Sequence, residues 1–453
     1  MLSFTLAWGS SSGCELEGPM RERLEAVRRV PEDLGPPRRV FAKRFVAPIW
    51  QEPNPVARRL GYLRAGALLH SKTTRPVGDE GCEAGWYELD TGGFVCAGRD
   101  VTLFDGDRLP ERRAVQPDRD GVMPYDFATV RRRTPLYRRL PARDEIVVIP
   151  DPGDDDTEGA AAVEIDSPLV TRVLEPGFYV SLDRTFERDG VTYWRTQQNG
   201  FVPDKALRLK EWSEFQGVAL SGGPDSLPMA VTRAGDTPVY KLSLRERVRP
   251  TRGVLGPRTW LQIRGRRQLD GEAYLLVGDN RLVRESDVRM ILPSAPPEAV
   301  SDDERWIDID LGSQVLVAYE GRRPRYVTLI SSGRLKTPRP DLDYRTPRGL
   351  FRIRAKHLTA TMDNDEPGEP PYSLEDVPYV MYFRGAYAFH SAFWHDRFGR
   401  PRSHGCINLA PADARWLYNW SGPDAPPTWH AAYASEDNPG TWVRVRGETP
   451  GRR

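Results

Sequence analysis

The chain has 453 residues, of which 39% are hydrophobic, and its 65 basic residues against 64 acidic ones give a net charge of +1. This length predicts two to four folded units. The balanced charge excludes a strongly basic nucleic-acid-binding scaffold, and no apolar run approaches the roughly eighteen residues that a membrane span needs. Seven of the basic residues are lysines and the other 58 are arginines, spread along the chain. We attribute this bias to a high-GC coding sequence rather than to a phosphate-binding surface.

The first segment, residues 1–38, mixes charge with proline and glycine and is predicted to be an export segment followed by a flexible tether. Within it, Cys14 follows Ser11-Ser12-Gly13, which resembles the end of a bacterial lipoprotein signal. The preceding apolar stretch is short and has no Lys or Arg. Two alternatives stay open: lipidation of Cys14 with anchoring to a membrane, or a plain secretion remnant. We expect an exported protein of the periplasm or cell envelope in either case.

A ten-residue pattern of strand, Gly or Asn turn and returning strand occurs at 86–95, at 193–202 and, more faintly, at 274–283. Each copy is predicted to be a β-hairpin. The first two copies end in Gly-Phe-Val and resemble the hairpin of bacterial SH3-like domains. Because the copies are unevenly spaced, they indicate a series of domains rather than a regular solenoid.

The resemblance implies small SH3-like barrels that bind wall peptides or position a catalytic unit. We expect three such modules, of which the third is the weakest, at residues 39–150, 160–215 and 216–292. Segments rich in proline, glycine and acidic residues are predicted linkers, at 151–159 and 293–303.

Cys82 and Cys96 flank the first predicted hairpin. If they face each other across it, they can form a disulfide. A disulfide is typical of an oxidising, extracytoplasmic compartment.

Strand and helix patterns continue beyond residue 303. Apolar and acidic residues alternate at 306–311, and an apolar run follows at 314–320 after Gly312-Ser313, which predicts a β-hairpin. Residues 346–353 read as the entry to another strand. A helix is predicted to begin near Pro411, because apolar residues recur at three- and four-residue spacing through Leu409, Ala412, Trp416 and Trp420.

The segment between Lys356 and Tyr379 carries four prolines and six acidic residues, which are Asp363, Asp365, Glu366, Glu369, Glu375 and Asp376. We interpret it as a loop. It could be a lid over a binding groove, where its acidic residues would attract an amino group, or an ordinary solvated loop, as charge runs usually are.

The densest chemical signal surrounds Cys406. Three of the six histidines, His390, His395 and His404, fall within fifteen positions of one another, and Ser403-His404-Gly405 leads directly into Cys406. A cysteine is a useful nucleophile only as thiolate, so it needs a nearby base. The pattern therefore predicts a cysteine acyl-transfer enzyme.

Three other interpretations compete with this one. Cys406 could be a buried structural thiol. His390, His395, His404 and Cys406 could hold a metal, although structural zinc sites usually show paired cysteines at short spacing. The chain could also belong to another class of cysteine peptidase, but in those classes the nucleophile usually precedes its histidine.

The order His390, then Ser403-His404-Gly405-Cys406-Ile407-Asn408, resembles the signature of the L,D-transpeptidase (YkuD-type) catalytic domain. The resemblance covers residues 304–447, and it includes the hairpin at 306–320 and Thr346-Pro347-Arg348-Gly349. It implies that Cys406 attacks an acyl carbonyl and that His390, oriented by the carbonyl of Ser391, takes the thiol proton. Amides at Gly405 and Cys406 would bind the oxyanion, and His404 and Asn408 would shape the pocket.

The same resemblance implies that Ser403 braces the turn. It also makes the aromatic residues near the nucleophile candidates for the wall of the groove. These are Tyr379, Tyr382, Tyr387 and Trp394. For any of them, a place in the hydrophobic core is the alternative.

The fold class expected is mainly β: SH3-like barrels followed by a β-rich L,D-transpeptidase-like catalytic domain with one or two helices. The implied reaction is acyl transfer from a peptidoglycan stem tetrapeptide through a Cys406 thioester to an amine, for cross-linking or for anchoring a protein in the wall, with no cofactor or metal. Hydrolysis of the same thioester as an L,D-carboxypeptidase, or a lapsed wall-binding protein, are the alternatives. We expect a monomer whose partners are stem peptides and not nucleic acid.

Overall fold

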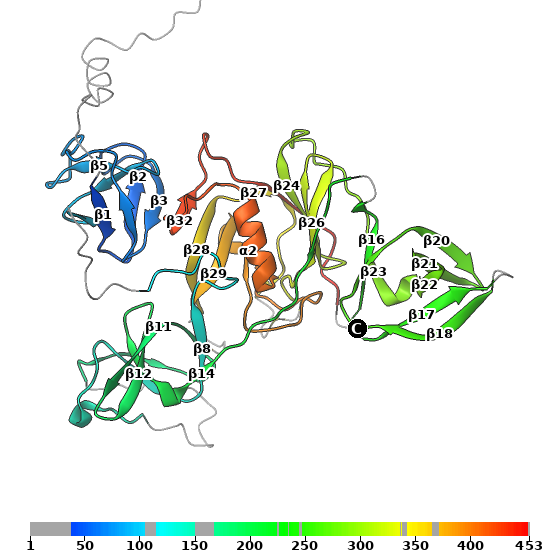
Figure 1. The fold of residues 1–453 in the computed structure, drawn as a ribbon, viewed down its shortest axis with the longest axis horizontal. Coiled ribbons are helices and arrows are strands. Elements are labelled where there is room, and N and C mark those ends of the chain that lie inside the picture. Colours follow the sequence, from blue (N-terminus) through cyan, green and yellow to red (C-terminus); the bar gives the residue numbers. More distant parts are fainter. Residues whose placement is uncertain are drawn as a thin grey trace, which may run out of the picture.

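The structure is a computed structural model and describes residues 38–104, 115–149, 167–223, 226–233, 235–243, 247–335, 337, 342–364 and 371–451. Cys14 and residues 1–37, and the predicted linker at 151–159, lie outside these residues. The described part is mainly β, as predicted, and has one α-helix. Figure 1 shows a central C-terminal region with two β-rich units on one side and a third on the other. No helix in the described residues is long and apolar enough to cross a membrane.

The first unit spans residues 38–104 and packs around buried Val40, Ile49, Leu63 and Val95. Its strands are β1 (Arg39–Ala42), β2 (Ala47–Trp50), β3 (Arg59–Leu63), β4 (Leu68–His70), β5 (Trp86–Glu88), β6 (Phe94–Cys96) and β7 (Val101–Phe104). The predicted hairpin at 86–95 is formed by β5 and β6.

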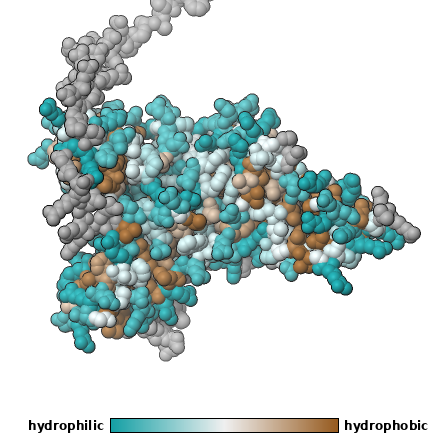
Figure 2. Space-filling view, in the orientation of Figure 1, coloured by the Kyte–Doolittle hydropathy of each residue, from teal (hydrophilic) through white to brown (hydrophobic). Residues whose placement is uncertain are grey.

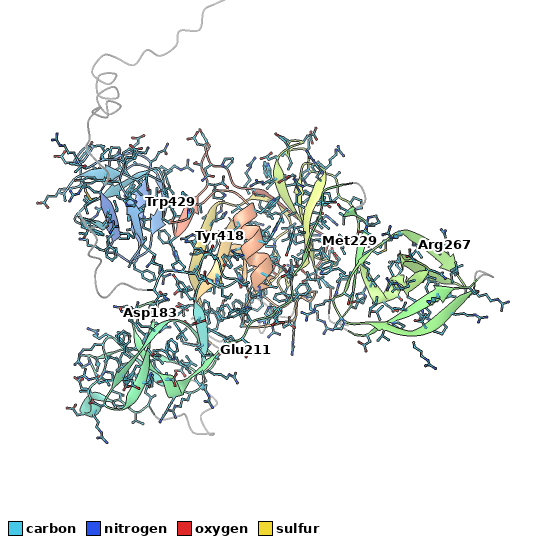
Figure 3. The ribbon with its side chains drawn as sticks, viewed as in Figure 1. Asp183, Glu211, Met229, Arg267, Tyr418 and Trp429 are labelled. Atoms are coloured by element: carbon cyan, nitrogen blue, oxygen red, sulfur yellow. A yellow bond between two sulfur atoms is a disulfide. The ribbon has the colours of Figure 1, made fainter. Side chains whose placement is uncertain are left out.

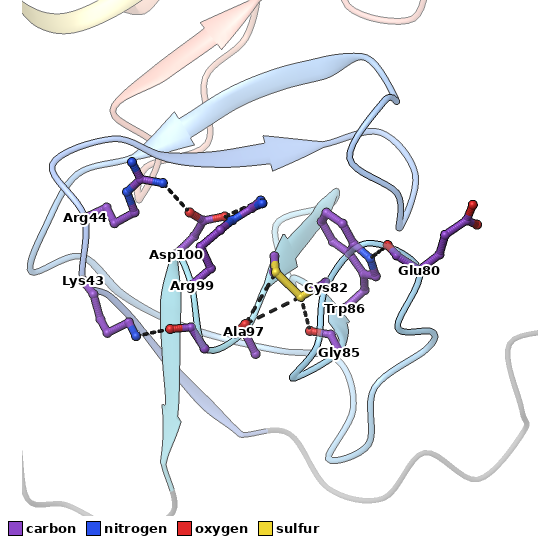
Figure 4. Close-up of a disulfide and its surroundings, with 11 residues drawn as sticks. Lys43, Arg44, Glu80, Cys82, Gly85, Trp86, Ala97, Arg99 and Asp100 are labelled. Atoms are coloured by element: carbon purple, nitrogen blue, oxygen red, sulfur yellow. Dashed lines mark hydrogen bonds and ion pairs between the residues drawn. A yellow bond between two sulfur atoms is a disulfide. The ribbon is translucent and has the colours of Figure 1, made fainter.

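A disulfide joins Cys82 to Cys96, with the two Cα atoms 5.7 Å apart (Figure 4). The geometry differs from the expected cross-hairpin pair, because Cys96 on β6 lies opposite Trp86. Cys82 lies in a turn before β5, and the carbonyl of Cys82 accepts the N–H of Gly85 at 2.9 Å. The disulfide therefore ties that turn to the hairpin.

The second unit contains β8 (Asp126–Val130), β9 (Thr134–Tyr137), η1 (Arg143–Glu145), β10 (Val170–Leu174), β11 (Tyr179–Arg188), β12 (Val191–Thr196), β13 (Phe201–Pro203), η2 (Asp204–Ala206) and β14 (Leu207–Leu209). The predicted hairpin at 193–202 is β12 and β13. β8 and β9 fall inside the first expected module. However, β8 pairs with β11 and β14, and β9 pairs with β10 and β13, which are strands of the second unit. Strand pairing thus places the division before β8 rather than at residue 150, and residues 151–159 connect two strands of one unit.

The third unit contains β16 (Met229–Thr232), β17 (Thr237–Leu242), β18 (Val248–Leu255), β19 (Trp260–Gln262), β20 (Gly265–Leu269), β21 (Glu272–Gly278), β22 (Arg281–Arg284), η4 (Glu285–Asp287) and β23 (Val288–Ile291). The faint third hairpin pattern is β21 and β22. The short strand before this unit, β15 (Val218–Ala219), joins the C-terminal region by pairing with β26. The described strands of residues 38–291 form sheets, and their pairing shows no closed barrel. The expected SH3-like barrels are therefore not shown.

The C-terminal region contains β24 (Arg305–Asp310), β25 (Val315–Glu320), β26 (Arg323–Leu329), β27 (Gly349–Arg352), β28 (Ala355–Asn364), β29 (Tyr372–Arg384), β30 (Tyr387–Ser391), β31 (Ile407–Leu409), α2 (Pro411–Trp420), β32 (Ala431–Tyr433) and β33 (Trp442–Arg446). β24 and β25 form the predicted hairpin. One sheet has the order β15-β26-β25-β24-β33-β27, and β28, β29, β30 and β31 belong to the second.

Helix α2 begins at Pro411, as predicted, because proline suits the first helical position. Its buried face is formed by Ala414, Leu417 and Tyr418, which belong to the core shared by both sheets. Trp416 is only half-buried and stacks on Tyr326 of β26, with the ring centroids 4.1 Å apart. Trp416 and Trp420 are half-buried and pack against this core.

The expected acidic loop is wrong for most of its length. Residues 355–364 and 372–384 are the paired strands β28 and β29, and Glu375 and Asp376 are 0% and 1% exposed within β29. Arg172 of β10 pairs with Glu375, and Arg64, which directly follows β3, pairs with Asp376. Asp365, Glu366 and Glu369 lie outside the described residues. The two acidic side chains of β29 contact the other units and are not a solvated run.

Sheet hydrogen bonds and polar contacts join the units. β3 pairs with β32, and Tyr179 of β11 is paired with Leu374 of β29. Trp429, labelled in Figure 3 between the first unit and the C-terminal region, donates from Nε1 to Thr91 Oγ1 at 2.9 Å. In Figure 2, hydrophilic residues cover much of the visible face, and apolar residues gather over the second and third units.

Candidate active site

His390 and Cys406 are brought together by two short parallel strands. His390 belongs to β30, and Cys406 immediately precedes β31; the register places His390 opposite Asn408. Both side chains line one cavity of about 1500 Å³. A loop separates the two residues in the sequence, and the pairing of β30 with β31 brings the two ends of this loop together.

The imidazole of His390 is fixed by the backbone. Its Nδ1 lies 3.1 Å from the carbonyl oxygen of Ser391, which accepts the Nδ1 proton. The other ring nitrogen, Nε2, is then the basic one. Burial lowers the pKa of His390 to about 4, and the Ser391 carbonyl opposes that shift. The ring therefore stands as a neutral base, stacked on Trp394 with centroids 5.6 Å apart.

Cys406 is the free cysteine of the described residues and is partly exposed. Burial raises the pKa of its thiol to about 11. Because a neutral imidazole lines the same cavity, the resting groups are a thiol and an imidazole rather than a thiolate and an imidazolium. Such a pair needs proton transfer during attack on the substrate.

The turn before Cys406 is held by two hydroxyl groups. Ser403 Oγ accepts the N–H of Gly405 at 3.0 Å and donates to the carbonyl of Cys406. Thr346 Oγ1, from the strand-entry motif, donates to the carbonyl of Gly405 at 2.8 Å. Gly405 has φ +124°, and a Cβ there would lie 2.4 Å from Cε1 of Tyr387. Glycine is therefore required at this position.

These contacts correct the expected oxyanion site. The Gly405 N–H already donates to Ser403, so it is not free to bind an oxyanion. Among the described residues, the N–H of Cys406 has no assigned acceptor. Ser403 braces the turn, which agrees with the role that the resemblance implied.

Asn408 contacts His395, which sequence reasoning considered only as a metal ligand. His395 Nδ1 accepts the N–H of Arg397 at 3.2 Å, and burial lowers the pKa of His395 to about 3. A neutral ring that accepts at Nδ1 carries its proton at Nε2. Nε2 lies 3.1 Å from the Asn408 amide, whose buried Oδ1 otherwise lacks a partner. In the structure Asn408 Nδ2 makes this contact. A proton on His395 Nε2 favours the flipped amide, with Oδ1 as the acceptor and the NH₂ in the buried position that now lacks a partner.

His404 lies at the mouth of the cavity rather than against the thiol. Its Nε2 is 3.0 Å from Nη2 of Arg334, and its ring packs edge-on against Tyr344 at 4.4 Å. Tyr372 stacks on the same ring at 5.5 Å. These neighbours give His404 a wall-forming place, as expected.

The aromatic candidates divide into wall and core. Trp394 lines the cavity. Tyr379 does not: it is 2% exposed in the core, and its hydroxyl donates to the carbonyl of Val122 at 3.0 Å. Its expected substrate role is therefore wrong. Tyr382 and Tyr387 are half-buried, and Tyr387 packs on Gly405.

The cavity wall also comes from parts of the chain that the sequence did not link to the site. Gly177 and Tyr179 belong to the second unit, and Arg233 and Arg289 belong to the third. No local pattern marks these residues, because they reach the site only through long-range packing. Among the described residues, no group of three or more His, Cys, Asp or Glu side chains is arranged to hold a metal ion.

Comparisons with known proteins agree with this geometry. Residues 304–445 match the family model described as the L,D-transpeptidase catalytic domain. YciB of Bacillus subtilis, named as a candidate L,D-transpeptidase, is 30% identical over 128 residues, which are 25% of this chain and 59% of that protein. The chain thus spans less than two thirds of that relative.

Solved structures give distant matches. The NMR structure of the Enterococcus faecium L,D-transpeptidase catalytic domain is 25% identical and is 98% covered, over 32% of this chain, with a TM-score of 0.24. An L,D-transpeptidase from Mycobacterium smegmatis is 18% identical, with a TM-score of 0.25. The match covers 57% of this chain and 91% of that protein. By the family match, residues 304–445 are an L,D-transpeptidase (YkuD) catalytic domain.

Proposed function

We propose that the chain is a peptidoglycan L,D-transpeptidase that forms a thioester at Cys406 with a stem tetrapeptide and transfers the acyl group to an amine. The observation that carries this proposal is the hydrogen bond from His390 Nδ1 to Ser391, which leaves Nε2 as a base in the cavity that Cys406 lines. A fixed tautomer beside a nucleophile is the arrangement of a catalytic triad.

The reaction runs in two halves. In the first, Cys406 Sγ attacks the peptide carbonyl while its proton passes to His390 Nε2, and the terminal D-Ala leaves as an amine that takes this proton. In the second, an acceptor amine loses a proton to Nε2 and attacks the thioester, and the departing Cys406 thiolate takes this proton from Nε2. The Cys406 N–H and the Asn408 NH₂ are the donors proposed for the oxyanion.

Residue positions support the use of both donors. Cys406 immediately precedes β31, and Asn408 lies within that strand two positions further on. Both line the cavity. One well-placed donor is worth roughly 3 kcal/mol of transition-state stabilisation.

The remaining proposals concern location and the N-terminal units. We place the chain in the periplasm or cell envelope, where the Cys82–Cys96 disulfide would persist. The three N-terminal β units, proposed to be SH3-like, would position the catalytic domain on the wall or bind the wall weakly. Lipidation at Cys14 is part of the same proposal.

The test is a transfer assay with purified chain, a stem tetrapeptide and a fluorescent D-amino acid as acceptor, analysed by mass spectrometry. Transfer of the acyl group with loss of D-Ala, absent from Cys406→Ala, is the expected result. Release of tripeptide without transfer would identify a carboxypeptidase instead. No reaction in folded protein that retains a titratable Cys406 would overturn the enzymatic proposal and favour a wall-binding protein.

A further inference from the structure

Six arginines line the cavity that contains Cys406, which are Arg233, Arg289, Arg334, Arg397, Arg400 and Arg402. Among the described residues that line it there is no Asp or Glu. The described lining of the cavity next to the thiol is therefore strongly cationic.

Two of these arginines come from the third unit. Arg289 is half-buried on β23 and donates from Nη2 to the carbonyl of Gly399 at 2.8 Å. Arg233 follows β16 and donates from Nε to the carbonyl of Ser286 at 3.1 Å. The third unit therefore forms part of the wall around the catalytic residues.

The third unit is docked firmly enough to hold this position. Asp396 lies on the loop between Trp394 and Arg402. Arg258 of the third unit donates two hydrogen bonds to its carboxylate, at 2.6 and 2.8 Å. Phe215 stacks between Trp260 of the third unit and Phe398 of the same loop. These contacts fix the loop and the unit against each other.

The cationic groups of the cavity repel one another. Burial, together with the charges of Arg233 and Arg400, lowers the pKa of Arg289 to about 10. Burial also lowers the pKa of Arg402, with added effects from Arg397 and Arg334. Such mutual repulsion is unfavourable unless a bound anion compensates it.

Arginines elsewhere in the molecule are commonly paired with acids. Arg64 pairs with Asp376, and Arg446 pairs with both Asp308 and Asp310. Among the described residues, none of the six cavity arginines is within ion-pair distance of a carboxylate. Their charge is available to a ligand.

We propose that Arg233, Arg289 and Arg400 form an anion subsite that binds the free carboxylates of the peptide that reaches Cys406. This proposal rests on the proposed function and names the part of its substrate that the third unit recognises. A carboxylate-bearing peptide is favoured over a separate polyanion, because the arginines and the thiol share one continuous cavity. Guanidinium groups bind carboxylates through paired, charge-assisted hydrogen bonds.

Direct binding tests the subsite without relying on turnover. In Cys406→Ala, we would measure the affinity for a stem tetrapeptide with free carboxylates and for the same peptide with its carboxylates amidated. Amidation is expected to weaken binding by about tenfold or more, and this difference should shrink at high salt.

The variants separate charge from folding. Arg233→Gln/Arg400→Gln in the Cys406→Ala background should abolish most of the difference between the two peptides. Arg249→Gln/Arg252→Gln, which removes two exposed charges from β18 of the same unit, should keep it. Arg289→Lys should retain more of the preference than Arg289→Gln, because lysine keeps the charge.

The outcomes distinguish this inference from the proposed function. Equal binding of both peptides, or an unchanged preference in Arg233→Gln/Arg400→Gln, would overturn the subsite, even if the parent chain transfers acyl groups. A carboxylate preference that depends on these arginines would support it, even if the parent chain fails to transfer. Binding of a glycerol-phosphate oligomer, with no effect of amidation on the peptide, would assign the arginines to a phosphate polymer and overturn the proposal.

Discussion

Arg64, which directly follows β3, and Asp376 of β29 form a buried, bidentate ion pair between the first unit and the catalytic domain, in which Nη2 and Oδ2 are 3.0 Å apart. Ser181 of the second unit donates its hydroxyl to the same carboxylate at 2.6 Å. Thr359 donates to Oδ1 at 2.9 Å. One carboxylate therefore joins three parts of the chain.

Removing one partner of this pair should be costly. Arg64→Ala leaves Asp376 charged and buried, and we expect the free energy of unfolding to fall by about 3–5 kcal/mol. Urea unfolding followed by tryptophan fluorescence measures this loss. Arg139→Ala, which breaks an exposed pair with Glu145, is the matched control and should change little. A loss in Arg64→Ala no larger than in the control would contradict the role of this junction.

Glu375 should make stability depend on pH. Burial raises its pKa from 4.5 to about 8, although Arg172 opposes the shift. Between about pH 4.5 and 8 the unfolded chain has lost this proton while the folded chain keeps it, so the free energy of unfolding falls as pH rises. Glu375→Gln should flatten this part of the profile. A profile as steep as that of the parent chain would show that Glu375 does not cause it.

The thiol of Cys406 should behave as a neutral group at rest. Because its pKa is raised to about 11 and that of His390 is lowered to about 4, alkylation by neutral iodoacetamide should accelerate with pH up to the highest pH at which the chain stays folded. Mass spectrometry of the Cys406 peptide measures the rate. A plateau from pH 5 to 9 would instead indicate a preformed thiolate–imidazolium pair.

His390 and Ser403 should differ in their effects on acyl transfer. His390→Ala removes the base and should lower the rate by roughly 10²–10⁴-fold. Ser403→Ala removes the brace of the Gly405 turn and should slow the reaction by a smaller factor. Single-turnover acylation rates of the two variants give the comparison. Equal, complete loss in both would contradict these roles.

The candidate catalytic residues stand out in the sequence because their signal is local. His390, Gly405 and Cys406 lie within seventeen consecutive residues, and Pro411 marks the helix start by its own backbone chemistry. Hairpins are likewise local, so the strands around residues 86–95 and 306–320 were predictable.

The rest depends on contacts that are distant in sequence. Glu375 and Asp376 look like solvated charges until Arg172 and Arg64 are brought to them by other units. Tyr379 reads as a surface aromatic until it meets Val122. Arg289 joins the cavity only because the third unit docks on the Asp396 loop. Long-range pairing of this kind leaves no periodic trace in the sequence.

The most direct test of the account is the intact mass of the folded chain after exposure to a carbapenem. We predict one covalent adduct on the parent chain and none on Cys406→Ala. A folded parent chain that stays unmodified, although neutral iodoacetamide still labels Cys406, would contradict an acyl-enzyme mechanism at this residue.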